Sequence, residues 1–260
     1  MSSRGSWLTT SRTAAVLLPV VGLIAAIALW WAATVVFTIE PFLLPSPLDV
    51  VETFLEQPGY LLKETGVSLL ETMGGFLLAI VVGVPIALLI VRSAVLERLV
   101  YPLLLGVNAI PKIAIAPLLV VWMGFGMFPK VVMVLLVCFF PIVISTATGM
   151  KSTPVELVEL LRSLNASRSQ EYFKLRLTYA MPQIFTGLKV AISLAVIGSV
   201  IAEFVGAQAG LGYVISSSGQ SADTALAFAA ITLLSIMSII LFYGLVLLEQ
   251  KLLPWAQETR

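Results

Sequence analysis

Long apolar runs alternate with short polar segments along this chain. Crossing a bilayer as an α-helix takes roughly 20 apolar residues, and six runs are long enough. The runs cover residues 14–37, 66–91, 100–123, 129–149, 184–207 and 225–248. Backbone groups in hydrocarbon must be hydrogen-bonded within their own segment, and the alternating strand pattern of a membrane β-barrel is absent from the sequence. The pattern predicts an all-α polytopic membrane protein with six transmembrane helices.

The composition supports lipid as the main solvent. Apolar residues make up 59% of the 260 positions and charged residues only 11%, whereas a soluble domain carries about 25% charged residues. The net charge of +1 gives no basic footprint for nucleic acid. There is no His, and the single Cys, Cys138, lies in an apolar run. We expect no nucleic-acid partner, no internal disulfide and no metal site, and we expect Cys138 to serve packing.

The first apolar run follows Arg4 and Arg12, a pattern shared by secretory signals and first membrane helices. No charged residue occurs over residues 13–39, and this stretch is longer than the apolar core of a signal, which has roughly 7–15 residues. We expect a retained helix after a cytoplasmic tail at residues 1–13. Residues 14–260 are then a single domain. Cleavage of the first run is the alternative.

The basic residues predict the orientation. Six crossings put both termini on one side, and a cytoplasmic N-terminus leaves only Lys63 and Lys130 in external segments. The cytoplasmic segments then hold Arg4, Arg12, Arg92, Arg98, Lys151, Arg162, Arg168, Lys174, Arg176, Lys251 and Arg260. This bias follows the positive-inside rule, so we expect both termini in the cytoplasm.

The external segment after the first run, residues 41–65, is rich in proline. Ser46-Pro47-Leu48-Asp49 combines an N-cap residue, proline at the first helical position and an acid near the positive helix end. We expect a short helix there, lying on the outer membrane surface. Glycines and prolines in the second and third runs have two interpretations, close packing or the kinks of a pathway that opens and closes.

The polar segment at residues 150–183 carries two helix-start signals. Thr153-Pro154-Val155-Glu156 is a capping box with proline at the first helical position, and it predicts a helix over residues 154–164. Asn165 follows, and Asn suits the left-handed conformation that ends helices. Ser167-Arg168-Ser169-Gln170 is a second capping box, which predicts a second helix that ends near Pro182.

The first of these helices is amphipathic. Its apolar stripe, at helical spacing, contains Leu157, Leu160, Leu161 and Leu164, and its opposite side contains Glu156, Glu159 and Ser163. The residues alone leave two interpretations open. The two predicted helices and the turn between them form a hairpin. This hairpin either rests on the membrane surface or acts as a knob that fits a groove on a soluble partner.

Within the hairpin, Glu159-Leu160-Leu161 is followed by Asn165 and then by Leu175-Arg176-Leu177-Thr178. This spacing resembles the inner-membrane permeases of binding-protein-dependent ABC importers. Their hallmark is Glu-Ala-Ala, three residues, Gly, nine residues and Ile-x-Leu-Pro. Leucines replace the two alanines here, Asn165 replaces the glycine and Thr178 replaces the proline. The resemblance assigns contact with an ATPase to Glu156, Glu159, Leu160, Leu161, Asn165, Ala166, Ser167 and Arg168.

Further segments extend the resemblance over nearly the whole chain. They are residues 42–47, 111–118, 122–126, 184–189, 202–203 and 210–213. Together they are similar to the nitrate, sulfonate and taurine subgroup. The Pro111-Lys112 form resembles members that serve vitamins or their precursors, such as riboflavin or a thiamin pyrimidine, while taurine, sulfonates and nitrate remain open.

The resemblance implies a multi-pass subunit of a bacterial inner membrane that forms a solute pathway as a homodimer. Two cytoplasmic ATPase subunits would bind the hairpins, and an external binding protein would deliver the solute. The chain lacks G-x-x-x-x-G-K-[ST]. It is therefore expected to be no enzyme and to bind no cofactor, with ATP and magnesium in the partner ATPase. The rivals are an intramembrane enzyme and an ion-coupled secondary carrier, which would need several ionisable groups at membrane depth.

Charged residues inside the apolar runs are candidates for the pathway because they are costly in lipid. Lys112 is expected in the middle of the third span, after Pro111, so its ammonium either binds carbonyls freed by the proline or contacts the substrate. Glu203 either lines an outer gate near Gly206 or pairs near the interface. We therefore treat Pro111, Lys112, Glu203 and Gly206 as candidate pathway residues.

Overall fold

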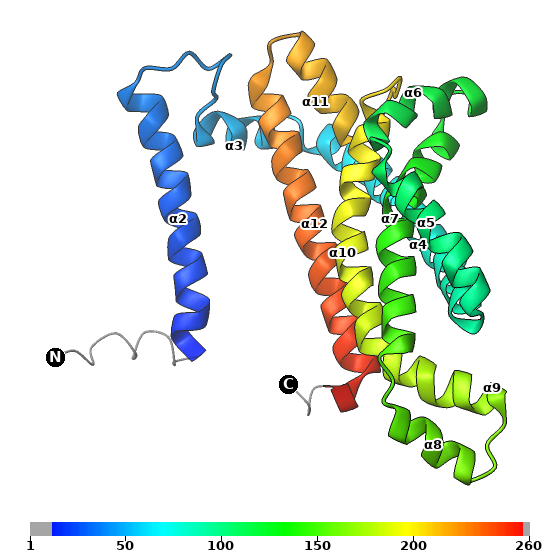
Figure 1. The fold of residues 1–260 in the computed structure, drawn as a ribbon. Helices are drawn as coiled ribbons and strands as arrows, with labels where there is room; N and C mark the ends of the chain where they lie inside the picture. The colour runs from blue at the N-terminus through cyan, green and yellow to red at the C-terminus, as the bar shows by residue number, and fades with distance from the viewer. Residues whose placement is uncertain (1–11, 257–260) are drawn as a thin grey trace.

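The computed structural model describes residues 12–256, and this part of the chain is helical with no strand (Figure 1). Its α-helices are α2 (Arg12–Val36), α3 (Pro47–Glu56), α4 (Pro58–Arg92), α5 (Ala94–Ala109), α6 (Lys112–Met123), α7 (Met127–Lys151), α8 (Val155–Ser163), α9 (Arg168–Gln170), α10 (Leu177–Glu203), α11 (Leu211–Gln220) and α12 (Thr224–Leu252). A π-helical segment, η1 (Glu171–Arg176), joins α9 to α10, and a 3₁₀ turn, η2 (Pro254–Ala256), follows α12. The all-α prediction is confirmed. The predicted tail at residues 1–13 falls outside the described residues except for the start of α2.

The centre of the bundle is built by α4, α7 and α10. Small residues let these helices approach closely, as is common in membrane proteins. A Cβ on Gly75 of α4 would overlap Val134 of α7, and a Cβ on Gly187 of α10 would overlap Ser145 of α7. Cys138 is buried in the main apolar cluster of this centre. The packing interpretation is therefore confirmed at Gly75, and so is the expected role of Cys138.

Five helical segments are long and apolar enough to cross a membrane, and a bent pair of helices would add a sixth if the pair forms one crossing. The pair is α5 and α6, whose axes meet at 91°. The predicted span over residues 100–123 is therefore broken near its middle, and its crossing of the membrane as one span stays a prediction. The break lies at Ile110 and Pro111, because proline has no amide hydrogen and forces the preceding residue out of the helical conformation; Ile110 is extended, with ψ of 127°.

The fifth crossing is longer than predicted at the end that carries the hairpin. The helical path runs from Arg168 through η1 to Glu203 without a stop at Pro182, so the predicted helix end there is wrong. Membrane helices tolerate internal proline because neighbouring groups satisfy the freed carbonyl. The second arm of the hairpin and the membrane helix α10 thus form one continuous helical segment.

Two short helices, α3 and α11, lie at the end of the molecule opposite the hairpin (Figure 1). The short helix α3 is present, and Ser46 and Asp49 form its capping box as predicted. Its Val50 packs with Leu61 and Ala229, so the helix rests on α12 as well as lying across the bundle end. The short helix α11 was not predicted, because its N-cap residue is Gly210, which has no capping side chain.

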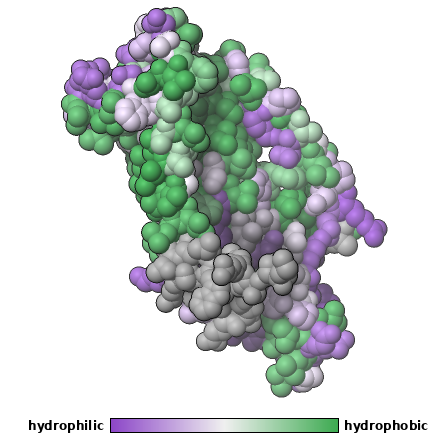
Figure 2. Space-filling view, turned by 90° about the vertical axis from the view of Figure 1, so that its left-hand side faces the viewer, coloured by the Kyte–Doolittle hydropathy of each residue, from purple (hydrophilic) through white to green (hydrophobic). Residues whose placement is uncertain are grey.

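Helix α2 stands apart from the other membrane helices (Figure 1). Only 6% of its apolar window is buried inside the structure, compared with 56% for the crossing formed by residues 168–203. Hydrophobic residues form a continuous column on the face that carries α2 (Figure 2). A helix that is apolar all round belongs in lipid or against other membrane helices.

Candidate functional site: a projecting hairpin and a buried polar network at the opposite end

The hairpin formed by α8, α9 and η1 projects beyond the membrane helices at one end of the bundle (Figure 1). Its sharp turn is a Schellman motif, in which two amides bond back to the last carbonyls of the helix. The Ala166 amide donates to the Leu161 carbonyl at 3.0 Å, and the Asn165 amide donates to the Arg162 carbonyl at 3.0 Å. Asn165 has a φ of 54°. The predicted left-handed Asn is therefore confirmed.

The second arm starts as predicted and the first arm does not. The Ser167 hydroxyl accepts from the Gln170 amide, and the Gln170 side chain accepts from the Ser167 amide at 2.8 Å. The predicted box between Thr153 and Glu156 is absent. The Thr153 hydroxyl instead donates to the Met150 carbonyl at the end of α7, and no side chain caps α8, which begins after Pro154.

A buried carboxylate braces the two arms of the hairpin. Glu171 in η1 accepts from the Arg162 guanidinium of α8 at 3.2 Å and from the Arg176 guanidinium at 2.8 Å. The next residue, Tyr172, donates its hydroxyl to the Leu88 carbonyl of α4. Sequence reasoning did not single out Glu171. In the sequence Glu171 lies between Arg162 and Arg176, and only the folded turn brings both guanidinium groups to its carboxylate.

Apolar side chains are exposed on α8 and at its end. Val158 points inward and is 5% exposed, whereas Leu160 and Leu164 are 56% and 69% exposed. Glu156 and Glu159 are also exposed, as are Asn165, Ser167 and Arg168; Leu161 and Ala166 are half-buried. The residues assigned to partner contact therefore include unpaired apolar side chains next to accessible charges.

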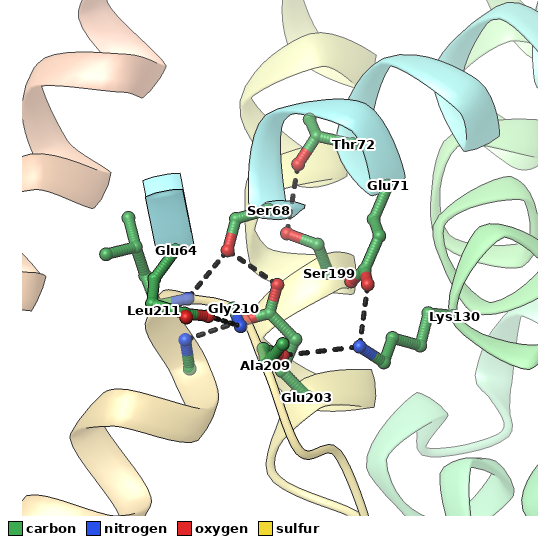
Figure 3. A network of polar contacts seen from close by, with 11 residues as sticks. Glu64, Ser68, Glu71, Thr72, Lys130, Ser199, Glu203, Ala209, Gly210 and Leu211 are labelled. Atoms are coloured by element: carbon green, nitrogen blue, oxygen red, sulfur yellow. Dashed lines mark hydrogen bonds and ion pairs between the residues drawn. The ribbon is translucent and has the colours of Figure 1, made fainter. Parts of the chain in front are cut away.

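A second polar cluster lies at the other end of the bundle, between α4, α7, α10 and the start of α11 (Figure 3). The first amides of a helix have no partner within the helix, and Gly210 offers no capping side chain. Residues from other helices bind them instead. The amides of Gly210, Leu211 and Gly212 donate to Glu64, Ser68 and Glu203 respectively. Thus α4 and α10 together cap α11.

The same cluster contains a buried ion pair. The Lys130 ammonium of α7 lies 2.6 Å from the Glu71 carboxylate of α4, and it also donates to the Ala209 carbonyl at 3.3 Å. The side chains of Lys130 and Glu71 are 11% and 2% exposed. The sequence placed Lys130 in an external segment and gave no sign of its pairing with Glu71. The missed signal was the spacing of Glu64, Ser68, Glu71 and Thr72, which share one face of an otherwise apolar helix.

Glu203 is at the centre of this network and is 1% exposed. Its carboxylate accepts from the Ser68 hydroxyl at 2.6 Å and from the Gly212 amide. A Cβ on Gly210, whose φ is 106°, would overlap that carboxylate. The geometry matches the pairing alternative, and a role for Glu203 in an outer gate stays a prediction.

The other candidate pathway residues lie at the break and at the rim. Lys112 is the first residue of α6, at the 91° bend rather than in the middle of a span. Its ammonium donates to the carbonyls of Val107, Asn108 and Ile110 at 3.3, 2.7 and 3.3 Å. It thus caps the end of α5, as the structural alternative expected, while a substrate contact stays a prediction. Pro111 is the N-cap residue of α6 and is exposed.

Gly206 follows the end of α10 and has a φ of 73°. A Cβ there would lie 2.7 Å from the ring of Phe125, in the turn between α6 and α7. The position therefore requires glycine both for its backbone and for the close approach of Phe125. Its assignment to a pathway is not tested by this contact.

Comparison with known proteins identifies the family. Residues 75–254 match the family described as "Binding-protein-dependent transport system inner membrane component". The chain belongs to this family. The matched residues include the hairpin and most of the central bundle, and the part of α4 that carries Glu64, Ser68 and Glu71 lies just before them.

Its relatives include transport permeases with described cargo. It is 36% identical to the formylaminopyrimidine transport permease protein ThiX of Halalkalibacterium halodurans, over 84% of this chain and 88% of that protein. It is 33% identical to the riboflavin transport system permease protein RibX of Chloroflexus aurantiacus, over 90% and 88%. It is 29% identical to the taurine transport system permease protein TauC of Escherichia coli, over 90% and 88%. The permease is thus an ABC importer subunit.

The fold also matches a solved structure. An inward-facing form of the MetNI methionine ABC transporter aligns with a TM-score of 0.67 at 20% identity, covering 75% of this chain and 98% of that chain. At this identity the match concerns the fold. It agrees with the all-helical membrane architecture described above.

Proposed function

We propose that the permease forms the solute pathway with a second copy of itself and that two cytoplasmic ATPase subunits bind the hairpins. The observation that carries this proposal is the hairpin itself, which projects beyond the bundle with Leu160 and Leu164 exposed. Exposed amphipathic helices bind apolar grooves on partners. ATP and magnesium bind in the partner, and this chain holds no cofactor.

The hairpin transmits motion because its second arm is continuous with a membrane helix. A push on α8 reaches Glu171 through Arg162 and passes along residues 168–203. At the far end of that path lies Glu203, which joins α10 to α4 and α11. ATP binding in the partner would thereby change the accessibility of a pathway whose candidate residues are Pro111, Lys112, Glu203 and Gly206.

The proposed cargo is a small solute delivered by an external binding protein, in the class of vitamins or their precursors. The named vitamin-related relatives, for formylaminopyrimidine and riboflavin, are 36% and 33% identical. Relatives for aliphatic sulfonates and taurine are 31% and 29% identical, so taurine, sulfonates or nitrate are the alternative. Binding of candidate solutes to the cognate external receptor separates the two classes.

The proposed location is the bacterial inner membrane, with both termini and the hairpin in the cytoplasm. The first turn of α2, the last turn of α12 and the hairpin lie at one end of the molecule (Figure 1), and the basic residues favour that end as cytoplasmic. In a Cys138→Ser background, Arg168→Cys should react with an impermeant thiol reagent only after the cells are opened. Labelling of intact cells would reverse the orientation.

Glu159→Lys tests the coupling proposal. Reversing an exposed charge in α8 should abolish or strongly reduce ATP-driven uptake and ATPase co-purification, while membrane insertion stays normal because the side chain is outside the bundle. Glu56→Lys, an exposed charge reversal in α3 at the opposite end, is the matched control for co-purification. Normal ATPase binding and uptake by the Glu159→Lys permease would contradict the role of the hairpin.

A further inference from the structure

A large cavity lies between the cytoplasmic end of α4 and the second arm of the hairpin. Its volume is about 1030 Å³. The α4 side is lined by Pro85, Leu88, Leu89, Val91 and Arg92, and the hairpin side includes Arg162, Arg168, Glu171, Phe173 and Arg176. The function proposed above uses the Arg162–Glu171 contact in the wall of this cavity but places no ligand inside it.

The polar part of the cavity is strongly basic. Four arginines line it against one glutamate. Arg162 and Arg176 are both bound to Glu171. The remaining two, Arg92 and Arg168, form no ion pair or hydrogen bond within residues 12–256 and are exposed. An excess of unpaired guanidinium groups around one space is the arrangement that binds phosphate and similar oxyanions.

The apolar part of the cavity lies on the membrane side. Leu88, Leu89 and Val91 belong to the last turns of a membrane-crossing helix that ends at Arg92. Leu89 and Phe173 leave 56% and 55% of their surfaces exposed. The cavity therefore changes from apolar to basic where the lipid headgroups of the leaflet meet the protein, because arginines at helix ends reach that interface.

We propose that this cavity binds an anionic phospholipid of the cytoplasmic leaflet, with the headgroup phosphate between Arg92 and Arg168 and an acyl chain along Leu89. Basic pockets beside membrane helices on the cytoplasmic side recognise such headgroups. The occupant is a lipid rather than a soluble anion because one wall is apolar and continuous with the lipid-facing part of α4. Leu160 and Leu164, the exposed apolar residues of the hairpin, do not line the cavity, whereas Ala166 and Arg168 do. The lipid therefore leaves the apolar contact surface of the hairpin open and shares Arg168 with the proposed ATPase contact.

The bound lipid would join α4 to the hairpin. Arg92 belongs to α4 and Arg168 to α9. The Tyr172 hydroxyl, which donates to the Leu88 carbonyl, already ties the hairpin to α4. A phosphate shared by both arginines adds a second tie. The inference relies on the cytoplasmic placement of the hairpin, but lipid retention can be measured without any ATPase partner or transport.

The test uses the full chain in nanodiscs that contain equal amounts of phosphatidylglycerol and phosphatidylcholine with the same acyl chains. After extraction in mild detergent, native mass spectrometry counts the lipids that remain bound. The wild-type chain should retain phosphatidylglycerol over phosphatidylcholine. Arg92→Gln and Arg168→Gln should each lower that preference roughly fivefold, since a basic residue near an anionic surface contributes about that factor.

Two variants control the result. Arg98→Gln removes another exposed arginine, on α5, which does not line the cavity, and it should retain the preference. Arg92→Lys keeps the charge and should keep most of the preference, which separates a binding role from a folding defect. Only variants whose elution volume and melting temperature match those of the wild-type chain are compared, so that a change in lipid retention does not reflect misfolding.

Three outcomes would overturn the proposal. Equal retention of both lipids by the wild-type chain would remove the preference for an anionic headgroup. An equal loss in Arg98→Gln would place the lipid elsewhere. Complete displacement of phosphatidylglycerol by inorganic phosphate would assign the arginines to a soluble oxyanion instead.

Discussion

The two ends of the helix that runs from Arg168 to Glu203 are built in opposite ways. At one end, Glu203 is 1% exposed and is held by Ser68 and Gly212. At the hairpin end, one carboxylate, Glu171, braces an arm whose Leu164 is 69% exposed. Separating the buried polar groups of the network would leave them without partners, which is costly, whereas an exposed hairpin can move at little cost. The end at Glu203 is thus suited to hold its neighbours in place and the hairpin end to receive a push.

The largest expected effect comes from breaking the buried ion pair. Lys130→Met leaves the Glu71 carboxylate buried and unpaired, and removal of one partner of such a pair costs about 3–5 kcal/mol of unfolding free energy. Thermal unfolding in detergent, followed by tryptophan fluorescence, measures the loss. Lys63→Met removes a lysine whose side chain is 75% exposed, and it should change stability by less than about 0.5 kcal/mol.

The paired replacement Glu71→Leu/Lys130→Met sharpens the result. It removes both charges, so much of the stability lost in Lys130→Met should return. A Lys130→Met permease that melts like the wild type would mean that the end at Glu203 is not fixed by this pair.

A somewhat smaller loss is expected from Gly210→Ala. The new Cβ would overlap the Glu203 carboxylate, and the φ of 106° disfavours any residue with a side chain. Backbone strain and overpacking together cost about 3 kcal/mol. Gly219→Ala, in the helix α11 with open space around its Cα, should be neutral or stabilise by up to about 1 kcal/mol. Equal melting of the two variants would contradict the packing of Glu203 on the start of α11.

The smallest effect should be confined to the hairpin. Asn165→Ala places alanine at a φ of 54°, which costs about 1–2 kcal/mol, whereas Asn165→Gly should be tolerated. Hydrogen exchange should become faster at the amides of residues 155–166 in Asn165→Ala, while the amides of residues 210–212 keep their protection. Faster exchange at both ends would show that the two regions do not open independently.

The sequence was most informative where local chemistry decides the structure. Apolar runs predicted the crossings because a lipid-spanning helix satisfies its own backbone groups. The hydroxyls of the capping residues Ser46 and Ser167 accept from amides three residues away, and Asn165 acts through its own left-handed backbone. Such short-range features can be predicted from the order of residues alone.

Tertiary contacts explain what was missed. The start of α11 is capped by Glu64, Ser68 and Glu203, which lie far from it in the chain or on another helix. Thr153 failed as a cap because its hydroxyl bonds to the preceding helix. The angle of 91° between α5 and α6 exceeds what a proline kink predicts by itself, and the fifth crossing continued through Pro182 because its neighbours support it.

The π-helical turn η1 explains how one carboxylate can brace the hairpin. Five residues separate Glu171 from Arg176, and in an α-helix that spacing would turn the two side chains about 140° away from each other. The wider turn of a π-helix, with its i→i+5 hydrogen bonds, returns them to nearly the same side, where they lie 2.8 Å apart. The ion pair therefore depends on the winding of the backbone: if this segment adopted α-helical geometry, Glu171 and Arg176 would separate, and the rotation of α10 relative to the hairpin would change with them.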